Sequence, residues 1–329
     1  MRRLLLSLGW LVVGGLIAVI LALNLGPREA VDRQIAFDPS DLPDDPAGLD
    51  AYLSTAEAQV ADLRPAAARR IHWAGAPGSV TDLSIVYLHG FSASSEEIRP
   101  VPDRLAEALR ANLHFARLTG HGRNGPAMAE ATAGDWIEDT AEALEIGRRI
   151  GRKVIVIGTS TGGTLAALVG HDETLREGVA GIVFVSPNFA VNRAGAALLT
   201  LPWARIWLPR LLGETSRFEP RNEGHAAHWT HEYPVVSVVP MAALVDHVRK
   251  LDHAQAAVPA LFVYSEHDAV VSPAATGSVL AAWGAPKGVA LRVMGSGDDP
   301  NSHVIAGDIL SPGQTDETVA LILDWARGL

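Results

Sequence analysis

The sequence predicts an α/β domain whose central sheet is mostly parallel and is flanked by helices on both faces. Short apolar runs rich in β-branched residues alternate with helical stretches from about residue 69 onward, a pattern that favours a parallel sheet covered by helices. The run Val154 to Ile157 is apolar at every position, as is typical of a central strand covered on both faces. With 48% hydrophobic residues in a chain of 329, one large core can form.

The expected elements follow one another in a regular order. A helix over residues 48–64 comes first, and Asp135 to Glu138 has the spacing of a capping box that opens a helix reaching about residue 150. Residues 188–253 interrupt the alternation and are too many for a plain loop, so they predict an inserted helical cap. The expected strands span residues 83–88, 113–118, 154–157, 179–185, 260–264 and 289–293, and the other helices span residues 96–111, 164–169 and 315–327.

The N-terminus predicts a membrane anchor. Residues 4–25 carry no charge and follow Arg2 and Arg3. As a helix this segment would rise about 33 Å, against about 30 Å for a bilayer core. No pair of small residues marks a cleavage site, which favours an uncleaved span over a cleaved signal peptide and secretion. Because positive residues stay on the cytoplasmic side, the domain is expected outside the membrane, in the periplasm if the source is bacterial.

Three regions are therefore expected along the chain. Residues 1–25 form a transmembrane or signal anchor, and residues 26–49, rich in proline and aspartate, form a linker that buries too little apolar surface to fold alone. Residues 50–329 form the main domain, with the cap at about residues 188–253.

Composition excludes several classes of function. The formal net charge of −10 argues against a nucleic-acid surface, which needs a concentrated basic face. The absence of cysteine excludes disulfides and thiolate chemistry. His225, His228 and His231 recur every third residue, but this spacing drifts around a helix and no carboxylate pairing is apparent. We interpret them as a polar cap surface and expect neither a metal nor a cofactor.

The pattern Gly158-Thr159-Ser160-Thr161-Gly162 is the only Gly-x-Ser-x-Gly in the chain. It lies between an apolar strand that ends at Ile157 and a helical stretch that begins just past Gly162. A nucleophilic serine needs this strand–turn–helix context, because it lies in a strained turn where flanking glycines relieve crowding. Ser160 is therefore the predicted nucleophile.

The predicted partners of the serine lie beyond later strands, in the order serine, acid, histidine. Asp268, in the loop after the strand 260–264, is the preferred acid, and Glu266 in the same loop is the second choice. His303 is the only histidine of the last loop. We expect His303 to accept the Ser160 proton as general base and Asp268 to fix its tautomer.

Acyl transfer also requires donors for an oxyanion. In such a site one donor is the backbone N–H that follows the nucleophile, here that of Thr161. The second is expected from the loop after the strand 83–88, where Gly90 would allow a sharp turn and leave the Phe91 N–H as donor. We interpret His89 as a structural histidine beside the site rather than as a catalytic one.

A set of motifs lies along the chain: His89-Gly90-Phe91, Leu118-Thr119-Gly120-His121-Gly122, Gly158 to Gly162, Ser186-Pro187, Asp268 and His303. Taken together, these motifs resemble the α/β-hydrolases related to monoacylglycerol lipases, lysophospholipases and bacterial carboxylesterases. The resemblance covers roughly residues 69–329. It implies hydrolysis of a carboxylic ester without a metal or organic cofactor, and it places His89, Gly90 and His121 near the substrate. Thr159 and Thr161 flank the serine where lipases of this group often have histidine or methionine.

The expected function is a membrane-anchored esterase or lipase-like serine hydrolase that works through an acyl-enzyme on Ser160 and takes a small-molecule or lipid ester. A thioesterase, an amidase or an acyltransferase on the same residues is the alternative, as is a non-catalytic binding protein with this fold. Trp203, Trp207 and Trp229 of the cap either line an acyl pocket or pack the cap onto the domain. The sequence leaves both interpretations open.

Overall fold

The computed structural model describes Trp10, residues 13–17 and residues 21–329, and a seven-stranded sheet runs through the domain. The strand order is β1-β3-β2-β4-β5-β8-β9, and every neighbouring pair is parallel except β1 with β3. The predicted mostly parallel sheet is confirmed, and the antiparallel edge strand β1 is an addition. The strands are β1 (Arg70–His72), β2 (Thr81–Leu88), β3 (Asn112–Phe115), β4 (Gly151–Thr159), β5 (Val179–Val185), β8 (Ala260–Tyr264) and β9 (Lys287–Leu291).

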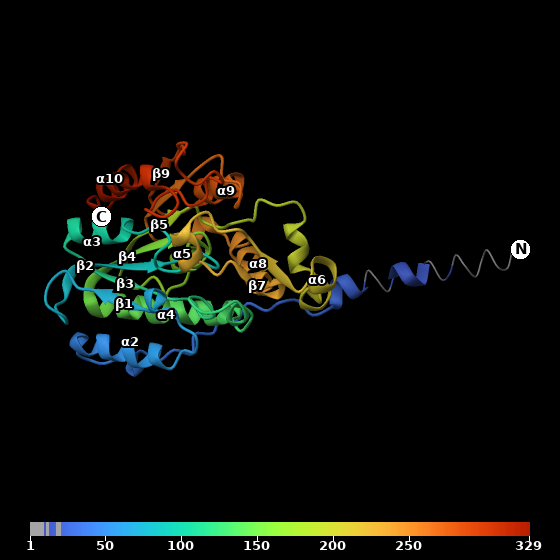
Figure 1. The fold of residues 1–329 in the computed structure, drawn as a ribbon, viewed down its shortest axis with the longest axis horizontal. Coiled ribbons are helices and arrows are strands. Elements are labelled where there is room, and N and C mark those ends of the chain that lie inside the picture. The colour runs from blue at the N-terminus through green and yellow to red at the C-terminus, as the bar shows by residue number, and fades with distance from the viewer. Residues whose placement is uncertain (1–9, 11–12, 18–20) are drawn as a thin grey trace, which may run out of the picture.

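Helices cover both faces of this sheet (Figure 1). They are α2 (Leu49–Ala58), α3 (Val101–Leu109), α4 (Ala133–Ile150), α5 (Thr161–His171), α8 (Val238–Arg249), α9 (Pro273–Ala282) and α10 (Thr315–Ala326). Successive strand residues point to opposite faces. Val86 and Val156 therefore pack with α4 and α5, whereas Ile85 and Ile155 pack with α3 and α10. The stretch Val154 to Ile157 of the central strand β4 is apolar at every position because both of its faces are buried.

Two helix starts differ from the expected ones. The helix expected from Asp135 begins two residues earlier, at Ala133, because the capping box is made by Thr132 and Asp135. The Thr132 hydroxyl accepts the Asp135 N–H, and the Asp135 carboxylate accepts the Thr132 N–H. The helix expected from residue 96 begins only at Val101, because Pro100 and Pro102 lack the N–H that a helix interior requires.

The insertion between β5 and β8 contains the helices α6 (Ala204–Leu212), α7 (Glu223–His228) and α8. It also contains a two-stranded antiparallel sheet, β6 (Thr215–Arg217) with β7 (Glu232–Pro234), which the sequence did not predict. Helix α8 lies in the predicted cap, yet its Leu244 and Val248 belong to the same core as α4 and α5. This end of the insertion is thus part of the main body.

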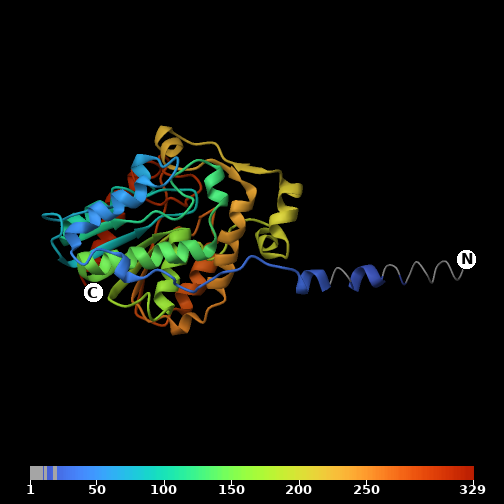
Figure 2. The same cartoon turned by 90° about the horizontal axis from the view of Figure 1, so that it is seen from below.

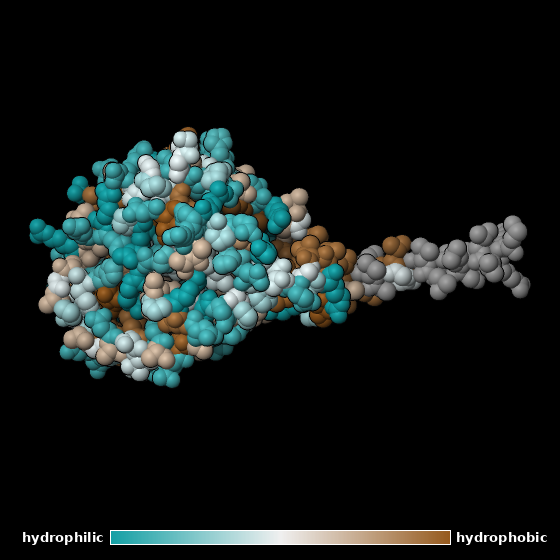
Figure 3. Space-filling model, in the orientation of Figure 1, coloured by the Kyte–Doolittle hydropathy of each residue, from teal (hydrophilic) through white to brown (hydrophobic). Residues whose placement is uncertain are grey.

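The three tryptophans of the insertion lie in different surroundings. Trp229 is 5% exposed and packs in the core cluster that contains Val304 and Ile305. Trp203 and Trp207 lie at the outer end of the cap with Leu198 and Leu201, beside residues 22–23. Figure 3 shows apolar residues gathered where the cap meets the N-terminal segment. Trp229 therefore packs the cap onto the domain.

The segment expected to be a linker lies against the main domain. Leu42 is 3% exposed and packs with Leu49 and Leu53 of α2. The Glu138 carboxylate of α4 accepts the Phe37 N–H at 2.9 Å, and the Arg149 guanidinium donates to the Pro39 carbonyl at 2.6 Å. Figure 2 shows this segment running alongside α4. The domain boundary at residue 50 stays a prediction.

Residues 27–29 connect this segment to the cap. The Trp203 N–H donates to the Pro27 carbonyl at 2.9 Å, and Arg28 donates to the Thr200 carbonyl at 2.7 Å. The Glu29 carboxylate pairs with Arg205 of α6 at 2.6 Å. Through residues 27–45 the chain thus joins the outer end of the cap to α4.

The membrane-anchored, extracytoplasmic localisation predicted from residues 4–25 is corrected by the structure. Within the described residues, no helix is both long and apolar enough to span a bilayer. The rest of the expected span, at residues 4–9, 11–12 and 18–20, lies outside the described residues.

Candidate active site

Ser160 occupies a strained turn between β4 and α5. Its φ is 51° and its ψ is −113°, a conformation that non-glycine residues rarely adopt. Glycine is required on both sides of this turn. A Cβ atom on Gly162 would lie 2.0 Å from the Leu88 carbonyl oxygen, and one on Gly158 would lie 2.4 Å from the Gly162 carbonyl oxygen. The close approach of three backbone segments therefore fixes the turn and presents the serine hydroxyl.

The structure brings the three predicted triad residues together. The Ser160 hydroxyl lies 3.1 Å from Nε2 of His303, and Nδ1 of the same ring lies 2.8 Å from the Asp268 carboxylate. All three side chains are buried. Each follows a strand at the same edge of the sheet, as expected when parallel strands end side by side. The geometry is that of a nucleophile, a base and an orienting acid.

Asp268 is held by its own loop. One carboxylate oxygen accepts the N–H groups of Val270 and Val271 at 2.8 and 2.9 Å, which leaves the other for His303. Glu266, the second choice for the acid, has an exposed side chain. The carboxylate that pairs with the His303 ring is therefore that of Asp268.

The electrostatics around His303 favour a base that takes up a proton readily. Burial alone would lower the pKa of the imidazole. The charge of Asp268, its hydrogen bond and the charges of Glu97 and Asp299 together outweigh burial and raise the pKa above its usual 6.5. The Asp299 carboxylate accepts the backbone N–H groups of His303 and Val304, both at 3.1 Å, and so orders the loop that carries the ring. It also faces the Arg221 guanidinium of the cap at 3.6 Å.

The two predicted oxyanion donors lie on either side of the nucleophile. Thr161 is the first residue of α5, and the first N–H groups of a helix have no partner within it. The Phe91 N–H has no backbone acceptor among the described residues. Its residue follows Gly90, whose added Cβ atom would lie 3.1 Å from the Ser160 Cβ atom. Both N–H groups are thus available beside the serine, although their role as donors stays a prediction.

His89 and His121 are fully buried beneath Phe91. Nε2 of His89 accepts the Leu118 N–H, so its Nδ1 carries the proton and donates to the Gly90 carbonyl at 2.8 Å. Burial lowers the pKa of His89 to about 4 and that of His121 well below its usual value, so both rings are neutral. The His121 ring lies 5.6 Å from the Phe91 ring, centroid to centroid. Substrate contact by Gly90 and these two histidines stays a prediction.

The sequence does not indicate that Glu97 is a buried acid near the site. Glu97 follows Glu96 in a polar run, and only the fold separates the two. Glu96 pairs with Arg70 and Arg99, whereas Glu97 is 2% exposed and lies next to Gly90. His225, expected on a polar surface, is also buried, because its ring packs between Phe218 and Trp229.

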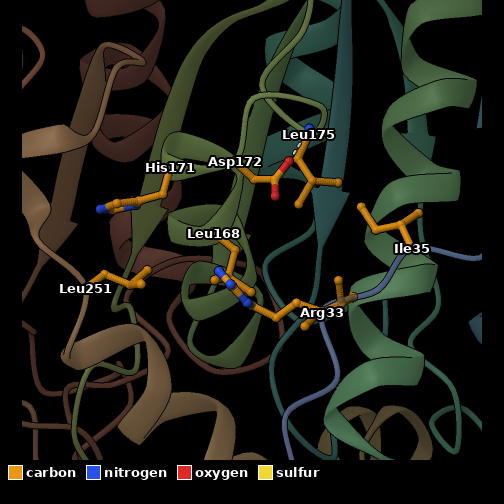
Figure 4. Close-up of a pocket in the computed structure, with 8 residues that line it drawn as sticks. Arg33, Ile35, Leu168, His171, Asp172, Leu175 and Leu251 are labelled. Carbon is orange, nitrogen blue, oxygen red and sulfur yellow. Dashed lines mark hydrogen bonds between the residues drawn. The ribbon is translucent and has the colours of Figure 1, made fainter.

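A small pocket of about 80 Å³ lies at the other end of α5 from the serine (Figure 4). Leu168, His171 and Asp172 line it, and Asp172 accepts the N–H of Leu175 there at 3.1 Å. Because α5 has eleven residues and rises about 1.5 Å per residue, this pocket is roughly 15 Å from the nucleophile. It is not part of the site around Ser160.

The fold and this site define a serine hydrolase of the α/β-hydrolase class. The family described as serine aminopeptidase, S33, matches residues 80–293, and the chain belongs to it. The match spans the strands from β2 to β9 and includes Ser160 and Asp268. No curated protein sequence matches this chain.

Solved structures that superpose on this chain include lipolytic enzymes and monoacylglycerol lipases. A metagenome-derived lipolytic enzyme superposes with a TM-score of 0.63 at 20% identity, covering 81% of this chain and all of the other. The monoglyceride lipase of Saccharomyces cerevisiae has a TM-score of 0.57 at 10% identity, covering 78% and 90% of the two chains. The monoacylglycerol lipase of Paleococcus ferrophilus has a TM-score of 0.54 at 14% identity, covering 78% and 96%. At these identities the likeness shows the fold.

Proposed function

We propose that this protein is a carboxylic ester hydrolase of esterase or lipase-like type that works through an acyl-enzyme on Ser160. The observation that carries the proposal is the continuous hydrogen-bonded chain from the Ser160 hydroxyl through the His303 ring to the Asp268 carboxylate. A buried serine in a strained turn, bonded to a histidine that an acid orients, is an arrangement for nucleophilic attack on a carbonyl.

The reaction runs in two halves. In the first, the Ser160 oxygen attacks the ester carbonyl while Nε2 of His303 takes the hydroxyl proton, and the N–H groups of Phe91 and Thr161 stabilise the resulting oxyanion. The tetrahedral intermediate then expels the alcohol, which takes the proton from His303, and the acyl group stays on Ser160. In the second half, His303 removes a proton from water and the resulting hydroxide attacks the acyl carbonyl. The Ser160 oxygen then leaves and takes this proton back from His303, so that the acid and the free enzyme are released. Asp268 stabilises the imidazolium in both halves.

The cap meets the site at Phe91. Tyr233 of β7 lies edge-on to the Phe91 ring, with 5.3 Å between centroids. The aromatic contact puts an apolar wall from the cap beside the proposed oxyanion donor, which suits an ester with an apolar acyl group.

A fluorophosphonate probe tests the nucleophile directly. Wild-type full-length protein is expected to be labelled, and Ser160→Ala is expected to lose labelling completely, because Ser160 alone among the described serines is bonded to the His303 ring. The matched control is Ser278→Ala, whose hydroxyl is exposed on α9 and donates to the Ala274 carbonyl. Labelling that persists in Ser160→Ala would remove Ser160 from the mechanism.

A second candidate function is amide hydrolysis, which the family description of serine aminopeptidase favours. The same triad can cleave an amide, but the leaving amine needs more help from the acid form of His303. A panel of p-nitrophenyl acyl esters, acyl thioesters and aminoacyl p-nitroanilides separates the candidates. The ester proposal expects the largest kcat/KM on acyl esters. Faster turnover of the anilides would replace it with the peptidase.

A further inference from the structure

We propose that Glu97 is a positioning residue of the oxyanion hole, whose carboxylate holds the Gly90 backbone beside Ser160 and places a second negative charge near His303. This inference rests on the proposed function. It assigns a role to a buried acid that lies outside the triad and that the mechanism above does not use.

The contact between Glu97 and the oxyanion loop is direct. One carboxylate oxygen of Glu97 accepts the Gly90 N–H at 2.7 Å and lies 3.1 Å from the Tyr87 hydroxyl. A Cβ atom added to Gly90 would lie 2.6 Å from the other carboxylate oxygen and 3.1 Å from the Ser160 Cβ atom. The α-carbon of Gly90 is therefore enclosed between the Glu97 carboxylate and the nucleophile, and a side chain at this position would push one of them away.

The hydrogen bonds on either side of Gly90 determine where the Phe91 N–H points. The Gly90 carbonyl accepts Nδ1–H of His89 at 2.8 Å and the Ala93 N–H at 3.3 Å. That carbonyl and the Phe91 N–H belong to one trans peptide group, so they point in opposite directions. Glu97 fixes the peptide before Gly90, and His89 fixes the peptide after it. Together they aim the Phe91 N–H away from the buried side of the loop.

The second part of the role is electrostatic. Burial raises the pKa of Glu97 to about 7, although the Gly90 N–H, the charge of His303 and the Tyr87 hydroxyl each favour the ionised form. In turn the negative charge of Glu97 helps to raise the pKa of His303. The charged groups that face His303 are Asp268 from the loop after β8, Glu97 from the turn after β2, and Asp299 from its own loop.

The sign of the effect follows from the role of His303 as a base. Activity requires the neutral ring, so activity falls as the pH drops through the pKa of His303. If the charge of Glu97 is removed while its shape is kept, the pKa of His303 falls over the pH range in which Glu97 is ionised in the wild type, about pH 7 and above. The acidic limb of kcat/KM in Glu97→Gln therefore lies at lower pH than in the wild type. A carboxyl that only filled space would leave this limb where it is.

Two variants of the full-length protein separate positioning from charge. Glu97→Ala removes the acceptor of the Gly90 N–H. We expect the rate at which a fluorophosphonate phosphonylates Ser160, and kcat on an ester, to fall about 10- to 100-fold with little change in KM. Glu97→Gln keeps an acceptor, so we expect it to recover most of this loss while its acidic limb moves to lower pH. Glu96→Gln, which alters the neighbouring ion pairs with Arg70 and Arg99, is the matched control and is expected to keep both the rate and the limb.

Each outcome decides the inference. It is overturned if the fluorophosphonate phosphonylates Glu97→Ala at the wild-type rate, or if the acidic limb of Glu97→Gln coincides with that of wild type. If Glu97→Ala does not fold, the pH profile of Glu97→Gln and an NMR titration of its His303 ring decide instead. Labelling that persists in Ser160→Ala would end the proposed function. Labelling that depends on Ser160 together with an unaltered Glu97→Gln profile would end this inference alone.

Discussion

The two turns that face each other across the proposed site are built in different ways. The turn at Ser160 is fixed by backbone packing, because Cβ atoms on Gly158 or Gly162 would overlap neighbouring backbone atoms. The oxyanion loop at Gly90 is fixed by side chains, with the Glu97 carboxylate on its N–H and the His89 ring on its carbonyl. The loop of His303 resembles the second kind, since the Asp299 carboxylate accepts two of its N–H groups.

This difference has a practical meaning for substitution. A turn held by backbone contacts has no room for an added atom, so we expect substitutions there to lower the stability of the fold before they affect activity. A loop held by buried carboxylates keeps its path when the chain is altered conservatively, so changes there should first cost activity. The predictions below test this contrast from the largest expected effect to the smallest.

The largest effect is expected from Asp268→Asn. The neutral amide of asparagine cannot stabilise the imidazolium of His303, and its NH2 group favours the tautomer that carries the proton on Nε2 instead of Nδ1. We therefore expect kcat to fall by about 10³- to 10⁴-fold while the fold is retained. Glu266→Gln, an exposed change in the same loop, is the control and should stay within about twofold. Ester turnover and circular dichroism measure the two properties. The reverse order of the two variants would transfer the orienting role to Glu266.

A smaller effect, and one on stability, is expected from Gly162→Ala. The new Cβ atom would lie 2.0 Å from the Leu88 carbonyl oxygen, and neither backbone can move without disturbing the sheet. We expect the free energy of unfolding to fall by about 3 kcal/mol or more. Gly75→Ala is the matched control, because its Cβ atom would meet nothing within 4 Å. Denaturant unfolding measures the stability of both variants, and equal stabilities would mean that the turn at Ser160 is not held by backbone contacts.

The smallest effect is expected from Tyr87→Phe. It removes the hydroxyl that lies 3.1 Å from both the Glu97 carboxylate and the Thr159 hydroxyl, which should lower stability by about 1 kcal/mol. The ionised form of Glu97 loses one partner, so the pKa of Glu97 should rise and its charge should appear at higher pH. An NMR titration of Glu97 checks this, and Tyr52→Phe, a change at the distant hydrogen bond to Glu142, is the control. A lower pKa of Glu97 in Tyr87→Phe would contradict the expectation.

The same contrast explains how much of the fold and of the candidate site could be predicted from the sequence. The parallel sheet and the turn at Ser160 depend on local patterns: an apolar strand, a helical stretch, and glycines where backbone segments approach closely. The structure accordingly brings Ser160, Asp268 and His303 together in the expected chain order. Glu97 could not be distinguished from Glu96, because adjacent acids share one local pattern and only the tertiary fold buries the second.

Two other differences have a similar origin. The run of uncharged residues near the N-terminus predicts an anchor, whereas the described residues hold no helix that could span a bilayer. The segment rich in proline and aspartate was expected to be a linker. Phe37 and Leu42 place it against α2 and α4, and two isolated apolar residues in a polar stretch are too weak a pattern to predict that contact.

That N-terminal segment has a consequence for how the protein is handled. Pro27, Arg28 and Glu29 bond to the outer end of the cap, and Leu42 completes the core beneath α2. A chain shortened to begin at the start of α2 would thus lose the segment that connects the cap to the main domain, and it would expose apolar surface. This proline-rich segment would be the first to be removed for expression or crystallisation. Its removal would take away contacts that hold the cap, so measurements on a truncated chain would describe a protein with an altered cap.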